Sequence, residues 1–312
     1  KLLFAQGLKP STLLCGKITG NYLLVTAIIL PAMLMMLIAT AIREPGMLAR
    51  MSYFNLGYLL YFLILTAVFV GISALAKSSK NALISSLGVW VLCFVMAPRL
   101  VAGFSSRLYP LPSRGEFNKM IETANSKGLQ GDKDRTERQR DYLKEVLSRY
   151  KVDSVSQLPL NFNGLRMQYG EDYLSKVYLT INGQVEESIG KQQHIERLFG
   201  FLDPFIAMQQ LSRALAGTDY NHHIHFHKQA QVYRDEFIRK LNLNMAYEDR
   251  NNLRSDYKVG PAFFKTMEDF SYSQPEANWA GCKHQLSLYA LLFWLGITAL
   301  AIGLISKKIA IN

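Results

Sequence analysis

The sequence predicts an all-α membrane protein in which four membrane-spanning helices carry one large, mainly helical domain. Two observations lead to this prediction: four long apolar runs contain no Asp, Glu, Lys or Arg, and lysines mark alternate ends of those runs. A third is the abrupt return of charged residues after Pro98, which places the large domain between the third and fourth runs. The uncharged runs cover residues 18–42, 51–76, 81–98 and 285–306.

The four runs are 25, 26, 18 and 22 residues long, and a helix of about 20 residues crosses the roughly 30 Å hydrocarbon core of a bilayer. Helices are expected because hydrocarbon offers no water to bind backbone polar groups. The third run is close to the minimum length, and its helix can extend towards Arg99. Four buried helices of a soluble core are the alternative, but such helices seldom contain more than about 14 uncharged residues in succession. A cleaved signal peptide fits poorly, because the first run is too long and a second follows closely.

Basic residues predict the orientation of the spans. The segments 1–17, 77–80 and 307–312 contain lysines and no acidic residue, so the positive-inside rule makes them cytoplasmic. The loop 43–50 and the domain 99–284 are then expected outside the cytoplasm, and the crossings alternate consistently. The lysines are Lys1, Lys9, Lys17, Lys77, Lys80, Lys307 and Lys308, and the tight cytoplasmic turn between the second and third runs reads Lys77-Ser78-Ser79-Lys80.

The formal net charge of +11 does not indicate a nucleic-acid-binding protein. Within the domain, 26 Lys and Arg residues are balanced by 23 Asp and Glu residues, and the basic residues are not sharply clustered. Of the three cysteines, only Cys282 belongs to the domain, so no internal disulfide can form there. The domain is therefore expected to fold on its hydrophobic core alone.

Proline and glycine positions divide the domain into expected elements. Residues 99–116 are expected to form an exit linker, because they contain two prolines and a glycine. Residues 116–150 are strongly charged and helical in pattern, with interruptions expected at Gly128 and Gly131. A loop is expected over 151–164.

The second half of the domain is expected to contain three helices. Residues 165–200 favour helix with a break near Asn182-Gly183. Asp203-Pro204 then provides an N-cap and a first-turn proline for an apolar helix from Phe205 to Ala216, which Gly217 closes. A further helix is expected from about 222 to 242.

Four histidines lie within six residues, in His222-His223-Ile224-His225-Phe226-His227. Neutral imidazole is a common ligand of Zn and Cu, which makes His223, His225 and His227 candidate metal ligands. These three would line one side of a strand, whereas on a helix only His223 and His227 share a face. The pattern favours the alternative, a helix N-terminus whose histidines are partly buried and hydrogen-bonded.

No catalytic or nucleotide-binding constellation is visible. Glu171-Asp172 and Glu186-Glu187 lie on charged segments that are typical of solvated faces. Gly16-Lys17 lacks the rest of a phosphate-binding loop, because Ser11 stands where Gly is needed and Ile18 where Ser or Thr is needed. We therefore expect a non-catalytic chain that holds no cofactor of its own. Because the four runs contain no acidic or basic residue, a secondary transporter with its coupling site in the spans is disfavoured.

The first segment reads Lys1-Leu2-Leu3-Phe4-Ala5-Gln6-Gly7-Leu8-Lys9-Pro10-Ser11-Thr12-Leu13-Leu14-Cys15-Gly16-Lys17. It resembles a segment of ABC-2 type permeases, in which a short amphipathic cytoplasmic helix leads through a Pro/Ser/Arg turn and a Gly-Lys pair into the third span. That helix lies on the ATPase subunit and transmits its motion. The family usually has a basic residue where Ser11 or Thr12 stands here. The resemblance assigns ATPase coupling to Lys1, Leu2, Leu3, Phe4, Ala5, Gln6, Gly7 and Leu8.

Three further motifs precede the last run: Leu202-Asp203-Pro204, then Leu211-Ser212-Arg213-Ala214-Leu215-Ala216-Gly217-Thr218-Asp219 with His222 to Phe226, and Tyr233-Arg234. They resemble an ABC-2 subgroup with a large extracytoplasmic domain before its last span. That subgroup often shows Leu-Ser-x-Ala-Leu-Ala-Gly-Thr-Asp followed by histidines and Phe. The resemblance implies two more spans and a first outer segment upstream, for six spans in all.

The same resemblance implies partners. It implies a pair of permeases, formed with a second copy or a paralogue, and two ABC ATPases that bind ATP and Mg, in the lipid of a bacterial inner membrane. A periplasmic or lipoprotein partner can dock on the domain, and no nucleic acid is expected. Three hypotheses follow: an export permease, a mechanotransmission subunit that acts on an envelope partner, and a membrane-anchored metal-handling protein that uses the histidine cluster.

Overall fold

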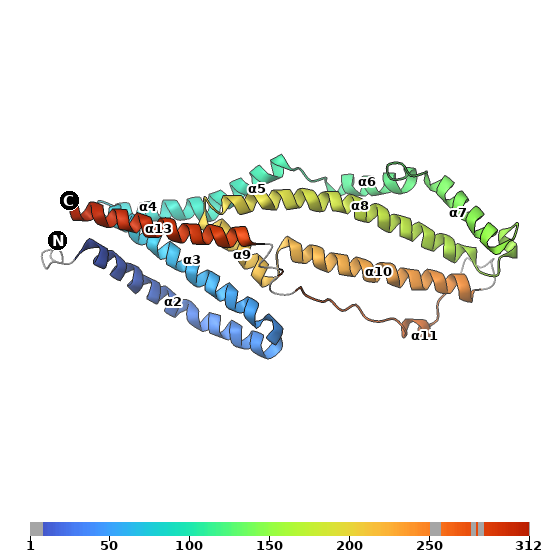
Figure 1. Cartoon of the computed structure of the whole chain (residues 1–312), viewed down its shortest axis with the longest axis horizontal. Helices are drawn as coiled ribbons and strands as arrows, with labels where there is room; N and C mark the ends of the chain where they lie inside the picture. The colour runs from blue at the N-terminus through green and yellow to red at the C-terminus, as the bar shows by residue number, and fades with distance from the viewer. Residues whose placement is uncertain (1–8, 250–256, 276–278, 280–283, 312) are drawn as a thin grey trace. The chain divides into compact units, whose positions relative to one another are not determined.

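The computed structural model describes residues 9–249, 257–275, 279 and 284–311, and these residues form helices and no strand. The chain divides into two compact units. We call them the span unit, which comprises the described parts of 1–109, 191–223 and 275–312, and the insert unit, which comprises those of 110–190 and 224–274. Figure 1 labels the elements of both units. The predicted all-α fold is confirmed.

Four helices of the described residues are long and apolar enough to cross a membrane. In the span unit, α2, α3 and α13 pack against one another, and α4 packs against α3. Most apolar side chains of α2 and of the third span are exposed, which fits a multi-pass membrane protein because lipid can cover them. The four are α2 (Pro10–Arg43), α3 (Leu48–Leu75, joined to α2 by the turn η1, Pro45–Met47), the continuous helix that begins with α4, and α13 (Gln285–Ile311).

The third span is longer than the run 81–98 and contains a π-helical turn. The exit linker expected over 99–116 is therefore wrong for 99–108, because the helix continues to Leu108, and the non-helical connection is confined to 109–113. The physical reason lies at Pro98, which has no backbone N–H to donate. A wider π-turn directly before it lets the helix pass the proline instead of ending there. The span consists of α4 (Ser79–Val91), the π-turn η2 (Leu92–Met96) and α5 (Ala97–Leu108).

The first two helices of the insert unit lie where the sequence predicts helix, over about 116–150, with the predicted interruption between them. Gly128 and Gly131 separate the first two helices, and both adopt left-handed φ angles, of 94° and 89°, that glycine tolerates. Ser113 and Glu116 form a capping box at the start of the first helix. The unit contains α6 (Arg114–Lys127), α7 (Arg135–Tyr150), the turn η3 (Val155–Gln157), α11 (Pro261–Phe264) and parts of α8 (Phe162–Phe199) and α10 (Tyr220–Glu248).

Helix α8 is unbroken, so the break expected near Asn182-Gly183 is wrong. Asn182 fits the helix because its side chain donates to Glu186, one turn later, at 2.7 Å. Gly183 weakens the helix by about 1 kcal/mol relative to Ala, which is too little to end a helix that packing supports elsewhere. Helix α10 is also longer than the expected 222–242. Both helices pass from one compact unit into the other.

The segment 99–284, which the sequence groups into one domain, is divided between the two units, because residues 99–109 and 191–223 belong to the span unit. Within 191–223, α9 (Pro204–Ala216) contacts α3 and α13. The sequence pattern does not distinguish the two placements, because an apolar helix of this length looks the same in the core of a domain and beside a span.

Gly164 allows α8 to approach α10 closely inside the insert unit. A Cβ atom there would lie 2.5 Å from the carbonyl oxygen of Asn242 and 2.6 Å from the backbone nitrogen of Ala246. We expect Gly164→Ala to lower the free energy of unfolding by about 2–3 kcal/mol, because backbone atoms of two helices must move apart. Thermal unfolding of the detergent-solubilised protein measures this. Gly183→Ala is the matched control on α8, and because it has open space around it we expect a slightly higher Tm. Equal melting temperatures for the two variants would contradict the close approach.

Candidate functional site

Helix α9 forms the centre of the candidate site, and it packs against the spans α3 and α13. Its buried face contains Met208 and Leu211, which join one apolar cluster with Ile64 of α3 and Leu291 of α13. Gly57 of α3 leaves room for this contact, since a Cβ atom there would lie 3.3 Å from the end of Met208. The apolar side chains of α9 are thus placed against membrane-spanning helices.

Both ends of α9 are defined by residues that the sequence predicts. Oδ1 of Asp203 accepts a hydrogen bond from the backbone N–H of Phe205 at 2.9 Å. Pro204 occupies the first turn, where its missing N–H has no intrahelical acceptor to lose. Gly217 ends the helix with a left-handed φ of 73°. The predicted N-cap and C-terminal glycine are confirmed.

The turn that precedes α9 and the first turn of α9 contact two spans well inside their length. Nε1 of Trp294 in α13 donates to the carbonyl oxygen of Gly200 at 3.2 Å. Phe205 stacks on Phe94 of the π-turn η2, with ring centroids 4.4 Å apart. A non-helical turn is acceptable among apolar spans only when its polar backbone groups have partners, and the Trp294 bond supplies one of these.

Asp203 brings a carboxyl group to this turn. Its side chain is 4% exposed, and its Oδ2 has no hydrogen-bond partner among the described residues. Burial raises the pKa of Asp203 to about 6, although the hydrogen bond from the backbone of Phe205 opposes this. The four apolar runs have no acidic residue of their own, but the packing of α9 supplies one from outside them.

Arg50, in the first turn of α3, binds the opposite end of α9. Its side chain is 1% exposed. Nε donates to the carbonyl oxygen of Leu215 at 2.6 Å, and Nη2 donates to that of Ala214 at 2.7 Å. These carbonyls belong to the last helical turn, which lacks intrahelical donors, and the guanidinium charge complements the negative end of the helix dipole. Gly217 keeps the space open, because a Cβ atom there would lie 3.0 Å from Nη2.

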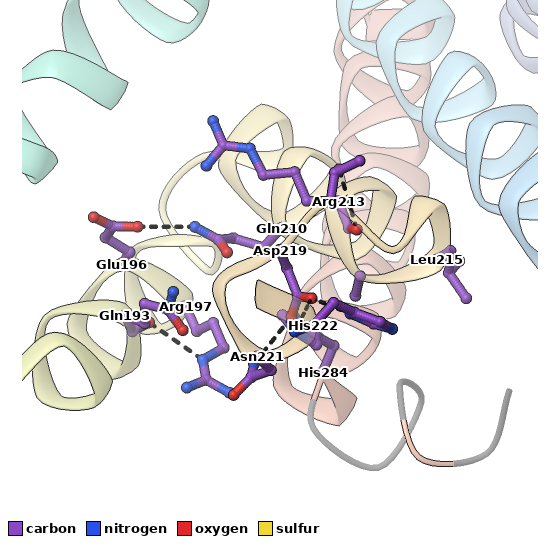
Figure 2. A network of polar contacts seen from close by, with 12 residues as sticks. Gln193, Glu196, Arg197, Gln210, Arg213, Leu215, Asp219, Asn221, His222 and His284 are labelled. Atoms are coloured by element: carbon purple, nitrogen blue, oxygen red, sulfur yellow. Dashed lines mark hydrogen bonds and ion pairs between the residues drawn. The ribbon is translucent and has the colours of Figure 1, made fainter. Parts of the chain in front are cut away.

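A buried network continues from Arg50 through His222 to Asp219. Nη2 of Arg50 lies 2.6 Å from Nε2 of His222, and because a guanidinium only donates, Nε2 accepts. The proton of His222 is therefore on Nδ1, which donates to Oδ1 of Asp219. Oδ2 of Asp219 accepts from Nε2 of His284 at 2.9 Å and from Nδ2 of Asn221 at 3.0 Å. Figure 2 shows the Asp219 carboxylate next to both histidines.

The pKa shifts agree with this assignment of protons. Burial lowers the pKa of His222, Asp219 opposes this shift, and Arg50 and His284 add to it. Burial disfavours the ionised form of Asp219, but hydrogen bonds from His284, His222 and Asn221 outweigh burial and hold the pKa of this carboxyl well below its usual range. The network therefore joins a guanidinium cation, a neutral imidazole and a carboxylate, and it can hold α9 through charge-assisted hydrogen bonds.

The candidate metal ligands His223, His225 and His227 are not brought together. All three lie on α10, and helical geometry turns His225 away from the other two. No group of three or more His, Cys, Asp or Glu side chains is placed to hold a metal ion within the described ranges. The three rings instead lie near tyrosines: His223 near Tyr220, His225 near Tyr272 and His227 near Tyr178.

The residues assigned to ATPase coupling lie outside the described residues, since these are Lys1, Leu2, Leu3, Phe4, Ala5, Gln6, Gly7 and Leu8. The turn Lys77-Ser78-Ser79-Lys80 is described, and all four of its residues are exposed. The side chain of Ser78 caps α4 by accepting from the backbone N–H of Asn81 at 3.2 Å.

Sequence reasoning does not identify Arg50, Asp219 and His284 as partners. In the sequence, Arg50 only marks the end of a short loop, Asp219 closes a motif, and His284 precedes the last run. One available signal is the spacing of Asp219 and His222, which are three residues apart and so share a helix face at an N-terminus. An arginine at the edge of an apolar run, which needs a partner if it is buried, is a second signal.

Loss of Arg50 leaves the last carbonyls of α9 without donors and the Asp219 carboxylate without the nearby cation. We expect Arg50→Ala to lower the free energy of unfolding by about 3–5 kcal/mol, as is typical when one member of a buried charged network is removed. Arg43→Ala is the matched control, because Arg43 is an exposed arginine at the end of α2. Thermal unfolding in detergent measures both variants. A similar small effect of the two substitutions would show that Arg50 does not hold α9.

Asp203 gives a pH-dependent prediction. Its pKa is raised to about 6 in the folded chain from an ordinary value of 3.8, so the folded state binds the proton more tightly. Its contribution to stability is complete below about pH 4 and is lost as pH rises to about 6. We therefore expect Asp203→Asn, which keeps the N-cap oxygen, to raise Tm relative to the native protein at pH 7.5 but not at pH 4.5. A Tm difference that does not change with pH would contradict the buried carboxyl.

Comparison with known proteins adds one finding. No curated protein and no solved structure matches this chain. A family model described as a domain of unknown function, DUF3526, matches residues 116–273. This match spans just over half of the chain and includes Asp203, Asp219 and His222 of the site. The chain therefore belongs to the DUF3526 family.

Proposed function

We propose that this chain is a membrane-spanning permease subunit of an ABC-2 type export complex. It would couple ATP hydrolysis by a partner ATPase to the movement of a substrate out of the cytoplasm. The proposal places the four spans in a bacterial inner membrane and the insert unit outside the cytoplasm. Four apolar helices, lysines at alternate ends of the runs, and motifs in residues 1–17 and 202–234 that resemble this family support it. ATP and Mg would be bound by the partner, which leaves this subunit without a catalytic residue.

The contact of α9 with α3 and α13 is the observation that carries this proposal. Helix α9 lies in sequence between α8 and α10, and each of these helices continues into the insert unit without a break. A rearrangement of the spans that displaces α9 therefore moves one end of two long helices. In an exporter, this connection would make a rearrangement of the spans move the domain that gates the exit.

The unbroken course of α8 also supports a second candidate function, mechanotransmission. A helix of 38 residues can pass on a displacement along its axis without any cargo crossing the spans. The domain would then act on an envelope enzyme or lipoprotein. Both candidates share the ATPase and a second permease copy or paralogue, and they differ in whether a substrate crosses the membrane.

Purification of the full-length protein from native membranes in mild detergent tests the proposal. We expect an ABC ATPase to co-purify in a fixed ratio and the complex to hydrolyse ATP, because the proposal assigns ATP binding to a partner chain. The double variant Leu3→Asp and Phe4→Asp should release the ATPase. Leu179→Asp, a change of the same kind at an exposed leucine of the insert unit, is the control and should retain it. Absence of any ATPase, or equal retention by both variants, would refute the proposal.

Orientation is tested by labelling single cysteines with a membrane-impermeant maleimide in intact spheroplasts. The background carries Ser in place of Cys15, Cys93 and Cys282. We expect Ser148→Cys, exposed on α7, to react from outside, and Ser79→Cys, exposed in the lysine-rich turn, to react only after the membrane is opened. The reverse pattern would place the large domain in the cytoplasm and exclude the exporter arrangement.

A further inference from the structure

The insert unit contains a cavity of about 410 Å³ between α7 and α8, and nothing in the proposed function assigns a role to it. Side chains of α7 at three- and four-residue spacing face the cavity, and the same spacing places side chains of α8 opposite them. The lining is therefore built from two regular helix faces within the family domain. It includes Arg135, Arg138 and Gln139 of α7 and Arg166, Tyr169 and Tyr173 of α8.

Arg138 is the fixed member of this lining. Its side chain is only 8% exposed. Nη1 donates to the carbonyl oxygen of Lys133 at 2.5 Å, and Nη2 donates to that of Asn125 at 2.8 Å. The guanidinium also lies over the ring of Tyr173, 3.4 Å from its centroid. Neutral carbonyls and an aromatic face hold the group in place but do not neutralise its charge.

Two more guanidinium groups line the same cavity. Arg135 and Arg166 are both exposed, and neither makes a hydrogen bond or ion pair with any other residue that the structure describes. Other arginines of this unit do find carboxylates, as Arg149 does with Glu145 at 2.7 Å. The cavity thus gathers three guanidinium groups without a carboxylate bound to any of them among the described residues.

The acidic groups nearby are already engaged. Glu171, the acidic residue of the lining, accepts from Nη2 of Arg234 at 3.2 Å. The charge of Asp132 acts on Arg138, but its carboxylate is bound by Lys176 at 3.0 Å and by the hydroxyl of Tyr173 at 3.0 Å. The cavity therefore keeps an excess of positive charge, and an anionic ligand would neutralise it.

The size of the cavity indicates an organic ligand rather than a bare ion. A volume of about 410 Å³ lies within the range of small-molecule sites and is much larger than one phosphate group. Tyr169 offers the organic part a fixed flat surface, because its ring stacks on Tyr142 with centroids 4.2 Å apart and planes within 9°. We propose that this cavity binds a small organic phosphate, with the phosphate between the three arginines and the organic part against Tyr169.

Phosphate is favoured over carboxylate by the number of donors. Three guanidinium groups present far more N–H donors than one carboxylate can accept, whereas a phosphate offers three oxygens and up to two charges. Gln139 of the lining adds an amide that can donate to a further oxygen. This assignment is independent of the permease proposal, since it concerns only residues of the insert unit.

Isothermal titration of the full-length protein in phosphatidylcholine nanodiscs tests the site, with glycerol 3-phosphate as probe. We expect saturable binding that is tighter than that of inorganic phosphate or citrate. Because each guanidinium contributes charge-assisted hydrogen bonds, Kd should rise about tenfold in Arg166→Gln and about a hundredfold in the double variant with Arg135→Gln. Both arginines are exposed, so these variants should keep the Tm of the native protein.

Arg140→Gln is the matched control, because it removes the same charge from an exposed position of α7 outside the cavity. Its Kd should stay within about twofold of the native value, since screening weakens a distant charge. An equal loss in Arg140→Gln, unchanged binding in the double variant, or tighter binding of citrate would overturn the proposal. Competition by phosphatidic acid added to the nanodisc would overturn the assignment to a soluble ligand. It would show that the phosphate in the cavity belongs to a lipid headgroup.

Discussion

Helix α9 has polar ends and lies against apolar spans. The hydrogen bonds that satisfy those ends determine which residues of the span unit contact one another. A helix terminus leaves backbone groups without partners, and in an apolar setting such groups must be bound by protein. At one end, Arg50 donates to the carbonyls of Ala214 and Leu215. At the other, Asp203 caps the first turn, and Trp294 binds the preceding turn through Gly200. The span α3 provides two of these bonds through Arg50, and α13 provides one to the turn before α9 through Trp294.

The charge of Arg50 explains the rest of the buried network. A buried guanidinium needs an anion nearby, and Asp219 supplies it through His222. His222 can accept from Arg50 and donate to Asp219 only when its ring is neutral and its proton is on Nδ1. The lowered pKa of His222 favours the neutral ring. His284 completes the set from the residue directly before α13. Three segments that are far apart in the sequence are therefore joined by one continuous set of hydrogen bonds.

The two arginines that are buried among the described residues, Arg50 and Arg138, differ in how their charge is balanced. Arg50 lies in a network that contains its own carboxylate, which is the arrangement expected of a structural contact. Arg138 is also buried, but carbonyls and a tyrosine ring surround it, and Arg135 and Arg166 bring further positive charge to the same cavity. A cavity with unbalanced charge is the arrangement expected of a ligand site. This contrast places the structural role in the span unit and the recognition role in the insert unit.

The sequence by itself determined the elements. Uncharged runs predicted the spans, because hydrocarbon excludes charge. Local chemistry predicted the ends of α9 and the break between α6 and α7, because Asp203, Gly217 and Gly128 each act within one turn of their own position. Errors arose where packing outweighed local preference, at Pro98 and at Gly183, because a π-turn and tertiary contacts offset modest local costs.

Only the tertiary structure decided which residues meet. Arg50 and His222 are 172 residues apart, and nothing in the sequence distinguishes them from other pairs of distant residues. Hydrogen bonds between distant segments depend on how the helices cross. The same holds for the arginines of α7 and α8, which are ordinary surface charges until the two helix faces enclose a cavity. Periodicity and capping are properties of a single helix, whereas burial and charge balance are properties of the packed molecule.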